Sequence, residues 1–526
     1  SEIGNIFSDN ARDLGVYFEF STNERAAMEA AIGASFSGLK CLVAMKSFGM
    51  NICSDPLFPF LYTGCRGPVV IAVGDDPGCW SSAESEENSR GYSGFMHLPT
   101  IEPADPEEMK EFIKIAFTVS EKYKLPVMVR FTTRVAHQKM IVKLGEISKE
   151  ETVKVGFIKD PDRYVTMPPR VLEMKKELFI KIEKIRQWAE TSKINAVKKQ
   201  FNGKKNKMYR GVGIITSGIG YLYTIEALKD LHIDIDVLKL GSFYPLPENK
   251  IKSFIKGRKK LLVVEELDPY VEKEVERLAK NINPRLQIFG KNVLSEIGEM
   301  KPEMVTNAIN RLIGKVYHLS IVEDSKLKIK RYPDFCPGCF YRLVFNAVKK
   351  VAPKDVVYGG DIGCYMIGSL PTYGLADYLS AMGSSIGIAH GIRKAANTSF
   401  SQASESKRRL ISFIGDSTFF HSGIPSLINT VFNKSNPLII ILDNQTTGMT
   451  GHQTNPGLGR TGSGEETTVI DIESIVKACG VKNVRVVDPI NMRDLETTIK
   501  DFLGKEDVSV IIAKRVCWLL SKSKKA

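Results

Sequence analysis

Apolar and polar residues follow two alternating patterns along this chain. Three apolar runs in the first part have the length of buried strands, and they lie at residues 41–46, 68–73 and 127–131. Apolar residues at helical spacing predict a helix over 106–123, between the last two runs. The alternation returns at 211–266 and again after residue 331, with strands expected near 356–358, 410–414, 438–442 and 508–513. Strands alternating with helices indicate parallel sheets covered on both faces. The pattern predicts an α/β protein with three doubly wound parallel-sheet domains.

Two polar stretches separate these three patterns. Residues 146–206 are rich in Lys and Glu, and their prolines precede a charged helix predicted at 171–200. A second polar stretch, 301–330, contains Pro302. We therefore expect a connector at 146–206, a linker at 301–330, and domains at 1–145, 207–300 and 331–526.

The composition is that of a globular protein, with 526 residues of which 43% are hydrophobic and 25% charged. No apolar run approaches the roughly 18–20 residues needed to cross a bilayer, and the first residues do not form a signal peptide. We expect a cytoplasmic protein. The net charge of +13 fits either a lysine-rich surface or attraction of an acidic partner. Nucleic acid is not an expected partner, because aromatic residues do not interleave with the basic clusters.

The most specific local pattern lies at the ends of two neighbouring predicted strands. Gly415 and Asp416 follow the first strand, and Asn444 and Thr446 follow the second. Glycine lets the backbone approach a phosphate closely, while the Asp416 carboxylate, the Asn444 amide oxygen and the Thr446 carbonyl are hard oxygen ligands suited to Mg²⁺. A Gly-Asp pair alone is a common turn. Paired with the second strand end, it predicts a diphosphate-and-magnesium site.

Four of the nine cysteines have spacing that predicts a metal site. Cys336 and Cys339 form a C-x2-C turn, Cys364 follows in a glycine-rich loop, and Cys517 lies near the end. Four thiolates can hold a [4Fe–4S] cluster or zinc. The absence of a second C-x2-C pair and the position of Cys364 beside the diphosphate motif favour the cluster. The other five cysteines are interpreted as small apolar residues.

Long motifs along the chain resemble those of the 2-oxoacid:ferredoxin oxidoreductase family, and within it the larger subunit of the indolepyruvate type. The resemblance spans nearly the whole sequence and is carried by Asn23-Glu24, Asp75-Asp76-Pro77-Gly78, Arg130-Phe131-Thr132-Thr133-Arg134, Val263-Val264-Glu265-Glu266, Phe335-Cys336-Pro337-Gly338-Cys339, Gly360-Asp361-Ile362-Gly363-Cys364, Gly415-Asp416-Ser417-Thr418 and Asp443-Asn444-Gln445-Thr446.

The resemblance implies roles for individual residues. Glu24 would be the carboxylate beside the aminopyrimidine of thiamine diphosphate, although in isolation it is a first-turn glutamate favoured by the helix dipole where a strand gives way to a helix. Asp416, Asn444 and Thr446 would hold Mg²⁺. The remaining cofactor contacts would be Cys364, Tyr365, Gly383, Gly415, Ser417, Thr418 and Met449. The cluster ligands would be Cys336, Cys339, Cys364 and Cys517, with Val516 in place of the proline usual before the last one.

By the same resemblance, the first domain would bind the thiamine pyrimidine, the second would be of the transketolase C-terminal type, and the third would bind the diphosphate. The implied reaction is oxidative decarboxylation of a 2-oxoacid, such as the aryl pyruvate indolepyruvate, to an acyl-coenzyme A with reduction of ferredoxin. A smaller β subunit is the implied partner. The chain lacks the family's usual first strand and its C-terminal ferredoxin-like domain, so we expect a fragment or a truncated product.

Two other functions remain open from the sequence. One is a thiamine-dependent decarboxylase without redox chemistry, which would need no cluster, and the other is a non-catalytic scaffold subunit. Arg130 and Arg134 are possible ligands of a substrate carboxylate. His421 and His452 lie near the diphosphate motif, but the sequence assigns neither a catalytic role.

Overall fold

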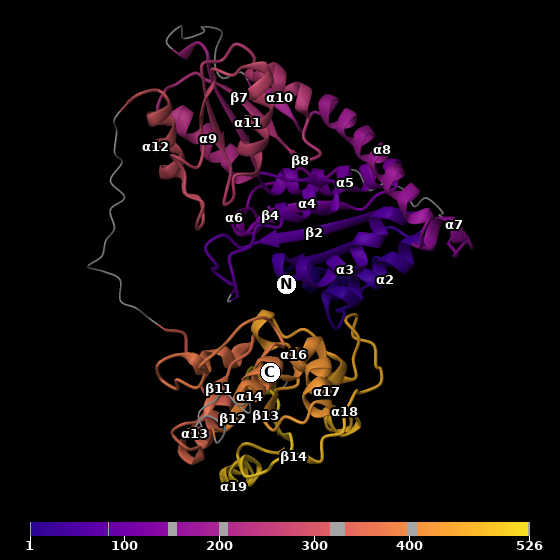
Figure 1. The fold of residues 1–526 in the computed structure, drawn as a ribbon, viewed down its shortest axis with the longest axis vertical. Coiled ribbons are helices and arrows are strands. Elements are labelled where there is room, and N and C mark those ends of the chain that lie inside the picture. Colours follow the sequence, from indigo (N-terminus) through magenta and orange to yellow (C-terminus); the bar gives the residue numbers. More distant parts are fainter. Residues whose placement is uncertain are drawn as a thin grey trace. The chain divides into compact units, whose positions relative to one another are not determined.

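The computed structural model describes residues 2–82, 84–145, 155–198, 209–315, 332–396 and 408–523. Parts of the predicted connector and linker therefore lie outside the described residues. The chain forms two compact units, one made of residues 24–324 and the other of residues 1–23 together with 325–526. The first unit contains two sheets and the second unit one (Figure 1).

The first sheet has the strand order β1-β2-β4-β3-β8. Its strands are β1 (Cys41–Lys46), β2 (Val69–Asp75), β4 (Val127–Thr132), β3 (Thr100–Ile101) and β8 (Ser242–Tyr244). The first four run parallel, and β8 closes the edge antiparallel to β3. The helices of this part are α2 (Glu24–Phe36), α3 (Ser47–Thr63), α4 (Arg90–Met96), α5 (Pro106–Tyr123) and α6 (Thr133–His137). Buried Val and Ile of β2 and β4 form the core between the helices, as expected for parallel strands.

The second sheet has the order β10-β9-β6-β7-β5. Its strands are β6 (Val212–Ser217), β7 (Asp236–Leu240), β9 (Lys260–Val264), β10 (Gln287–Phe289) and β5 (Ala196–Lys198), of which β5 alone is antiparallel. Its helices are α9 (Ile219–Asp230), α10 (Glu248–Ile255), α11 (Tyr270–Ile282) and α12 (Pro302–Leu312). The short α7 (Pro161–Tyr164) and the long α8 (Arg170–Thr191) lie between the two sheets in the sequence, and α8 buries Met174, Leu178, Ile182 and Ile185.

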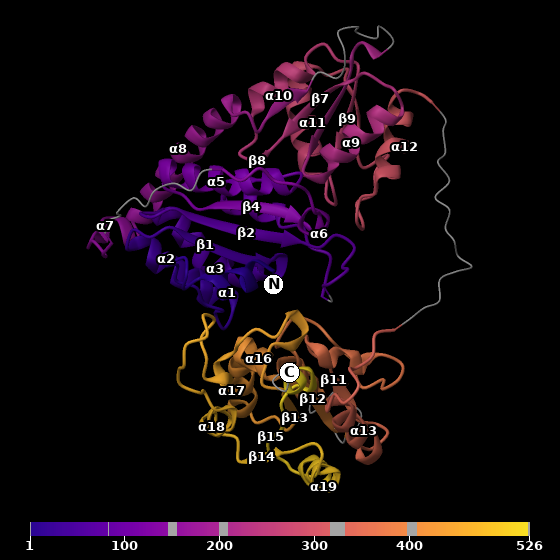
Figure 2. The same ribbon diagram turned by 180° about the vertical axis from the view of Figure 1, so that it is seen from behind.

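The third sheet, in the other unit, is entirely parallel with the order β11-β12-β13-β15-β14 (Figure 2). Its strands are β11 (Val357–Gly359), β12 (Leu410–Gly415), β13 (Leu438–Asp443), β14 (Asn483–Val487) and β15 (Ser509–Lys514). Its main helices are α13 (Tyr341–Val351), α14 (Ser385–Ala396), α17 (Ile424–Phe432), α18 (Ile472–Ala478), α19 (Met492–Leu503) and α20 (Trp518–Ser523). Apolar side chains of β12 and β13 pack on both faces, which explains their continuous Ile and Leu runs.

Residues 1–23 pack in this same unit and begin with helix α1 (Glu2–Asn10). The Gln453 amide donates a hydrogen bond of 3.3 Å to Asn5 Oδ1, and the Ser8 hydroxyl donates to the carbonyl of Gly462. The Asn23 amide donates to the carbonyl of His421 at 2.9 Å. This segment therefore holds the loops that follow β12 and β13.

The predicted fold class is confirmed, since the structure has three mainly parallel sheets covered by helices. Two details differ. The helix predicted over 171–200 ends at Thr191 and is followed by strand β5. The strand expected just before Glu24 is not found, since residues 16–23 pair with no sheet among the described residues. No helix in the described ranges is long and apolar enough to span a membrane.

Candidate functional site

Asp416 and Asn444 lie at the carboxyl ends of β12 and β13, which are neighbouring parallel strands with Gly415 opposite Leu442. Both side chains converge on the backbone N–H of Thr446, which lies 3.2 Å from Asp416 Oδ2 and 3.3 Å from Asn444 Oδ1. All three residues are buried. The structure thus brings together the predicted oxygen ligands from two strand ends, the edge at which open α/β sheets bind ligands.

The Asp416 carboxyl has an environment that favours a bound cation. Burial, followed by the nearby charge of Asp443, raises the pKa of Asp416 to about 7. The Asn455 amide donates to Asp416 Oδ2 at 3.0 Å and to Ser417 Oγ at 3.0 Å, which fixes both groups. A divalent cation would offset the cost of holding this carboxylate charged inside the protein. Asn455 was not predicted, because no spacing links it to the motif.

Asp361, which the sequence did not single out as a site residue, organises the loop on the other side of β12. Its carboxylate is fully buried and accepts backbone N–H bonds from Ile362 at 2.7 Å, Gly383 at 2.7 Å and Ser385 at 2.9 Å. Burial raises its pKa despite these bonds. Gly383 has φ +88°, and a side chain there would overlap the Ser422 hydroxyl. Asp361 thereby holds Gly383 in a conformation that glycine favours.

The other predicted cofactor contacts are distributed around these loops. The Tyr365 ring is buried, its hydroxyl donates to the Ile362 carbonyl at 2.8 Å, and a Cβ on Gly415 would come within 2.8 Å of that ring. Thr418 also donates to the Ile362 carbonyl, at 3.0 Å. Ser417 and Thr447 share a hydrogen bond of 2.7 Å between their hydroxyls. Met449 is half exposed. The Tyr365 side chain therefore supports the Gly415 turn from inside the core.

The four predicted cluster cysteines lie around the same loops. A Cβ on Gly448 would be 3.3 Å from the Asn444 amide nitrogen and 3.6 Å from the Cys364 sulfur, so this thiol adjoins the oxygen site. The Cys517 N–H donates to the Asn444 carbonyl at 3.0 Å.

The C-x2-C turn of Cys336 and Cys339 packs close to Cys517. A Cβ on Gly338, between Cys336 and Cys339, would come within 2.5 Å of the Trp518 indole nitrogen. Burial raises the pKa of Cys339 to about 11, with smaller contributions from the charges of the other three thiols. Within the described ranges, no three His, Cys, Asp or Glu side chains are arranged tightly enough to hold a metal ion. The four cysteines are neighbours, but the set is not closed around a common point.

Glu24 begins α2 in the other unit. Its half-buried side chain packs against α3, where a Cβ on Gly49 would lie 2.6 Å from Glu24 Cγ. Its charge also contributes to raising the pKa of Cys53, after the larger effect of burial. The helix N-terminus favours the charged form of a carboxylate.

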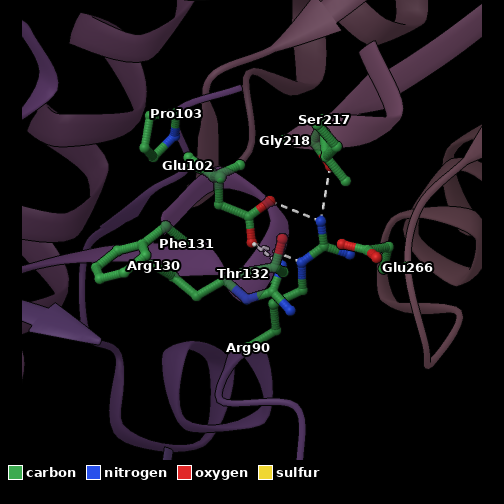
Figure 3. Close-up of a pocket in the computed structure, with 11 residues that line it drawn as sticks. Arg90, Glu102, Pro103, Arg130, Phe131, Thr132, Ser217, Gly218 and Glu266 are labelled. Carbon is green, nitrogen blue, oxygen red and sulfur yellow. Dashed lines mark hydrogen bonds and ion pairs between the residues drawn. The ribbon is translucent and has the colours of Figure 1, made fainter. Parts of the chain in front are cut away.

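A buried network of ionic groups joins the first and second sheets within residues 24–324 (Figure 3). The Arg90 guanidinium donates to both oxygens of Glu102 at 2.6 Å, to Glu265 at 2.8 Å and to the Ser217 hydroxyl at 2.7 Å. Arg130 donates to Asp75 at 2.8 Å. Each of these ionic side chains is at most 3% exposed. Their role is to join the two sheets.

Arg130 and Arg134, the possible ligands of a substrate carboxylate, both form ion pairs within the protein. Arg130 is enclosed by Asp75 and Glu102, and Arg134 forms a bidentate pair with Glu299 at 2.6 and 2.9 Å. Both guanidinium groups already contact carboxylates of the chain itself. Arg130 Nη2, however, is buried without a hydrogen-bond partner among the described residues, so the substrate-carboxylate interpretation stays a prediction.

Replacing Glu102 or Glu266 by glutamine is expected to change the free energy of unfolding in opposite directions. Burial opposes ionisation of Glu102, but Arg90 and Arg130 hold its pKa below the usual 4.5. Glu102→Gln leaves Arg90 short of a buried counter-charge, at a cost of roughly 3 kcal/mol. Burial raises the pKa of Glu266 above 4.5, so Glu266→Gln removes a charge that is unfavourable in the folded state.

The pH dependence distinguishes these two variants in urea unfolding. The contribution of Glu102 is present above pH 4.5 and is lost as pH falls through its lowered pKa. The contribution of Glu266 is complete below pH 4.5 and is lost as pH rises through its raised pKa. Glu266→Gln should therefore gain stability relative to the wild type as pH rises from 4.5. Equal pH profiles for both variants would contradict this account.

Two stretches of the chain match known protein families. Residues 1–201 match the family described as pyruvate flavodoxin/ferredoxin oxidoreductase, thiamine diphosphate-binding. Residues 361–513 match the family described as thiamine pyrophosphate enzyme, C-terminal TPP binding domain. These matches cover the Glu24 helix and the Asp416 and Asn444 loops. They define a thiamine-diphosphate-dependent oxidoreductase.

Full-length relatives narrow this class. The chain is 41% identical over 527 residues to the indolepyruvate oxidoreductase subunit IorA of Methanothermobacter marburgensis, covering 99% of this chain and 82% of the relative. It is 39% identical over 537 residues to the protein of the same name from Thermococcus kodakarensis, covering 99% and 81%. The chain belongs to the indolepyruvate oxidoreductase subunit IorA family.

The similar solved structures include one that aligns over part of the chain. It is the 2-oxoglutarate:ferredoxin oxidoreductase from Magnetococcus marinus with 2-oxoglutarate, coenzyme A and succinyl-CoA bound, with a TM-score of 0.44, 17% identity, and coverage of 58% of each chain. The chain is assigned to its family by the relatives at 41% and 39% identity.

Proposed function

We propose that this subunit oxidatively decarboxylates an aryl pyruvate, with indolepyruvate as the expected substrate, and passes the electrons to ferredoxin. One 2-oxoacid and one coenzyme A would give one acyl-coenzyme A, carbon dioxide, a proton and two electrons, which reduce two ferredoxins. The observation that carries the proposal is the Cys364 thiol beside the Asn444 loop. A cluster held by Cys364 and the other three cysteines beside the thiamine site would accept electrons, which a simple decarboxylation does not need.

The residues of the oxygen site fit Mg²⁺ and a diphosphate. Asp416 and Asn444 supply converging oxygens, and the buried Thr446 hydroxyl has no hydrogen-bond partner among the described residues. Together with the Thr446 carbonyl, these groups would hold Mg²⁺, whose remaining ligands are phosphate oxygens and water. When bound, thiamine diphosphate supplies the electron sink for loss of carbon dioxide.

Cys336, Cys339, Cys364 and Cys517 would hold a [4Fe–4S] cluster beside this site. Their mutual proximity supports a shared ligand set. After the larger effect of burial, the charges of the other three thiols contribute to the raised pKa of Cys339, and those of Cys517 and Cys336 contribute to the raised pKa of Cys364. A thiol must lose its proton to bind iron, and the positive charge of the metal supplies the driving force that the apolar surroundings oppose. The cluster would supply one-electron transfer out of the site.

The proposed partners are a smaller β subunit, ferredoxin and coenzyme A. The relatives are named as subunits, which implies a second chain. A net charge of +13 supports association with an acidic electron acceptor by long-range attraction. Such attraction weakens with salt, because the Debye length falls from about 10 Å at 0.1 M to about 3 Å at 1 M.

A Cys339→Ser variant tests the redox proposal, because Cys339 is a proposed cluster ligand but not a proposed contact of thiamine diphosphate. The complete complex would be purified without oxygen and analysed for iron and acid-labile sulfide, with about four irons expected per wild-type chain. The variant should lose most of this iron and its ferredoxin reduction, while its affinity for thiamine diphosphate with Mg²⁺ changes little. Cys479→Ser is the matched control, since this half-buried thiol lies in no predicted ligand set.

The same measurements separate the two other candidate functions. A wild-type complex that lacks iron but still releases carbon dioxide from the oxoacid would be a non-redox decarboxylase. A chain with no heat of binding for thiamine diphosphate and Mg²⁺ would be a scaffold. Either outcome would refute the proposed reaction.

A further inference from the structure

Glu24 packs against the one kind of residue that leaves room for it. Gly49 lies in the first turn of α3 and is buried, and a Cβ built there would be 2.6 Å from Glu24 Cγ. Carbon atoms that are not bonded approach only to about 3.5 Å. We propose that Gly49 is a positioning residue, whose missing side chain sets the direction of the Glu24 carboxylate. This inference rests on the proposed function and on the role that the family resemblance implies for Glu24, beside the aminopyrimidine of thiamine diphosphate.

The surroundings of Gly49 leave little room for a new methyl group. The same Cβ would lie 2.9 Å from both Met45 Cβ and Met45 Sδ. Met45 belongs to β1, where it lies opposite Val73 of the buried strand β2, so its backbone is fixed by the sheet. On the helix side, α3 is anchored by the buried Cys53, Leu57 and Phe60. A methyl group at position 49 therefore has to displace side chains, and Glu24 is the one that reaches the cofactor.

The sulfur atoms near Gly49 make the surface on which Glu24 packs apolar. The Cys53 thiol contacts Met45 Sδ at 3.7 Å and Met50 Sδ at 3.9 Å. Burial is the main reason that the pKa of Cys53 rises to about 12, so this thiol stays neutral and does not compete as a nucleophile or ligand. Glu24 thus lies on a wall of helix backbone and thioether, and small shifts of that wall become shifts of the carboxylate.

Gly49→Ala is expected to lower turnover by about 10²-fold, because a displacement of about 1 Å at a catalytic group has an effect of that size. Its affinity for thiamine diphosphate and Mg²⁺, measured by calorimetric titration, should stay within threefold of the wild type. The matched control is Gly33→Ala in α2, where a Cβ meets nothing within 4 Å. This control should keep wild-type turnover.

A double-mutant cycle with Glu24→Gln shows whether Gly49 acts through Glu24. If it does, Gly49→Ala should have almost no further effect on turnover in the Glu24→Gln background, whereas its effect on thermal unfolding should be the same in both backgrounds. Should Gly49→Ala fail to fold, the pair Met45→Ala with Gly49→Ala replaces it, since loss of the thioether removes the contact with Met45 Sδ and leaves the overlap with Glu24 Cγ to be tested.

The outcomes separate the inference from the proposed function. Wild-type turnover in Gly49→Ala, or an equal loss in both Glu24 backgrounds, would overturn the positioning role. Wild-type turnover in Glu24→Gln would instead overturn the proposed catalytic role of Glu24.

Discussion

Glu24→Gln is expected to lower turnover of the oxoacid by roughly 10²–10⁴-fold, the usual contribution of a general acid–base group. Glutamine keeps the size of the side chain and its packing on Gly49, but it cannot exchange a proton with the cofactor. Binding should be nearly unchanged, because the proposed diphosphate contacts lie in the loops after β12 and β13. The expected signature is a lower kcat with a KM close to that of the wild type.

Glu29→Gln is the matched control for this variant. Glu29 lies in the same helix, but it is exposed, and among the described residues its ion-pair partner is Arg25, at i,i+4 spacing. An exposed pair of this kind has little effect on stability, and we expect full turnover. A Glu24→Gln complex with more than a tenth of wild-type turnover would contradict the catalytic assignment.

Asp416→Asn is expected to weaken binding of thiamine diphosphate with Mg²⁺ by more than about 10²-fold. Residues that merely orient metal ligands already cost 10–100-fold when changed, and a carboxylate that binds the metal directly should cost more. Folding should be preserved, because asparagine still presents an oxygen to Asn455 and to the Thr446 N–H. Burial also disfavours the charged form of Asp416 in the free protein.

Calorimetric titration and thermal unfolding measure these two effects separately. Asp501→Asn is the control, since Asp501 is an exposed residue of α19 that pairs with Lys505. Unchanged affinity in Asp416→Asn would place the diphosphate elsewhere. A loss of stability as large as the loss of affinity would assign Asp416 a purely structural role.

The helix over 106–123 shows why much of this fold could be predicted from the sequence. The Asp105 side chain accepts the N–H of Glu108, Pro106 occupies the first position, and the helix ends where Lys124 adopts a left-handed conformation. These signals are local, so the predicted bounds match α5. The apolar runs of β12 and β13 were equally clear, because a strand buried on both faces admits few polar residues.

The end of α8 shows what the sequence could not supply. Nothing local stops the charged pattern at Thr191. The helix gives way to β5 because the Asn195 amide oxygen accepts the N–H groups of Gly241 and Ser242, about fifty residues further on. That signal is tertiary, and helix propensity alone does not include it.

Some residues of the candidate site could be predicted from the sequence and others could not. Asp416, Asn444 and Cys364 follow strands in recognisable motifs. Asp361 and Asn455 act through bonds to loop backbone and side chains, and such roles have no fixed spacing. The predicted ligand roles of the site residues, and the domain boundaries, remain predictions to be tested by the variants above.

The antiparallel strand β8 has a practical consequence for dissecting this enzyme. It follows β7 of the second sheet but completes the hydrogen bonding of β3 in the first. A fragment ending near residue 145 would leave that row of amide groups open to neighbouring molecules, which promotes aggregation. Chimeras between relatives should therefore exchange the two sheets as one module.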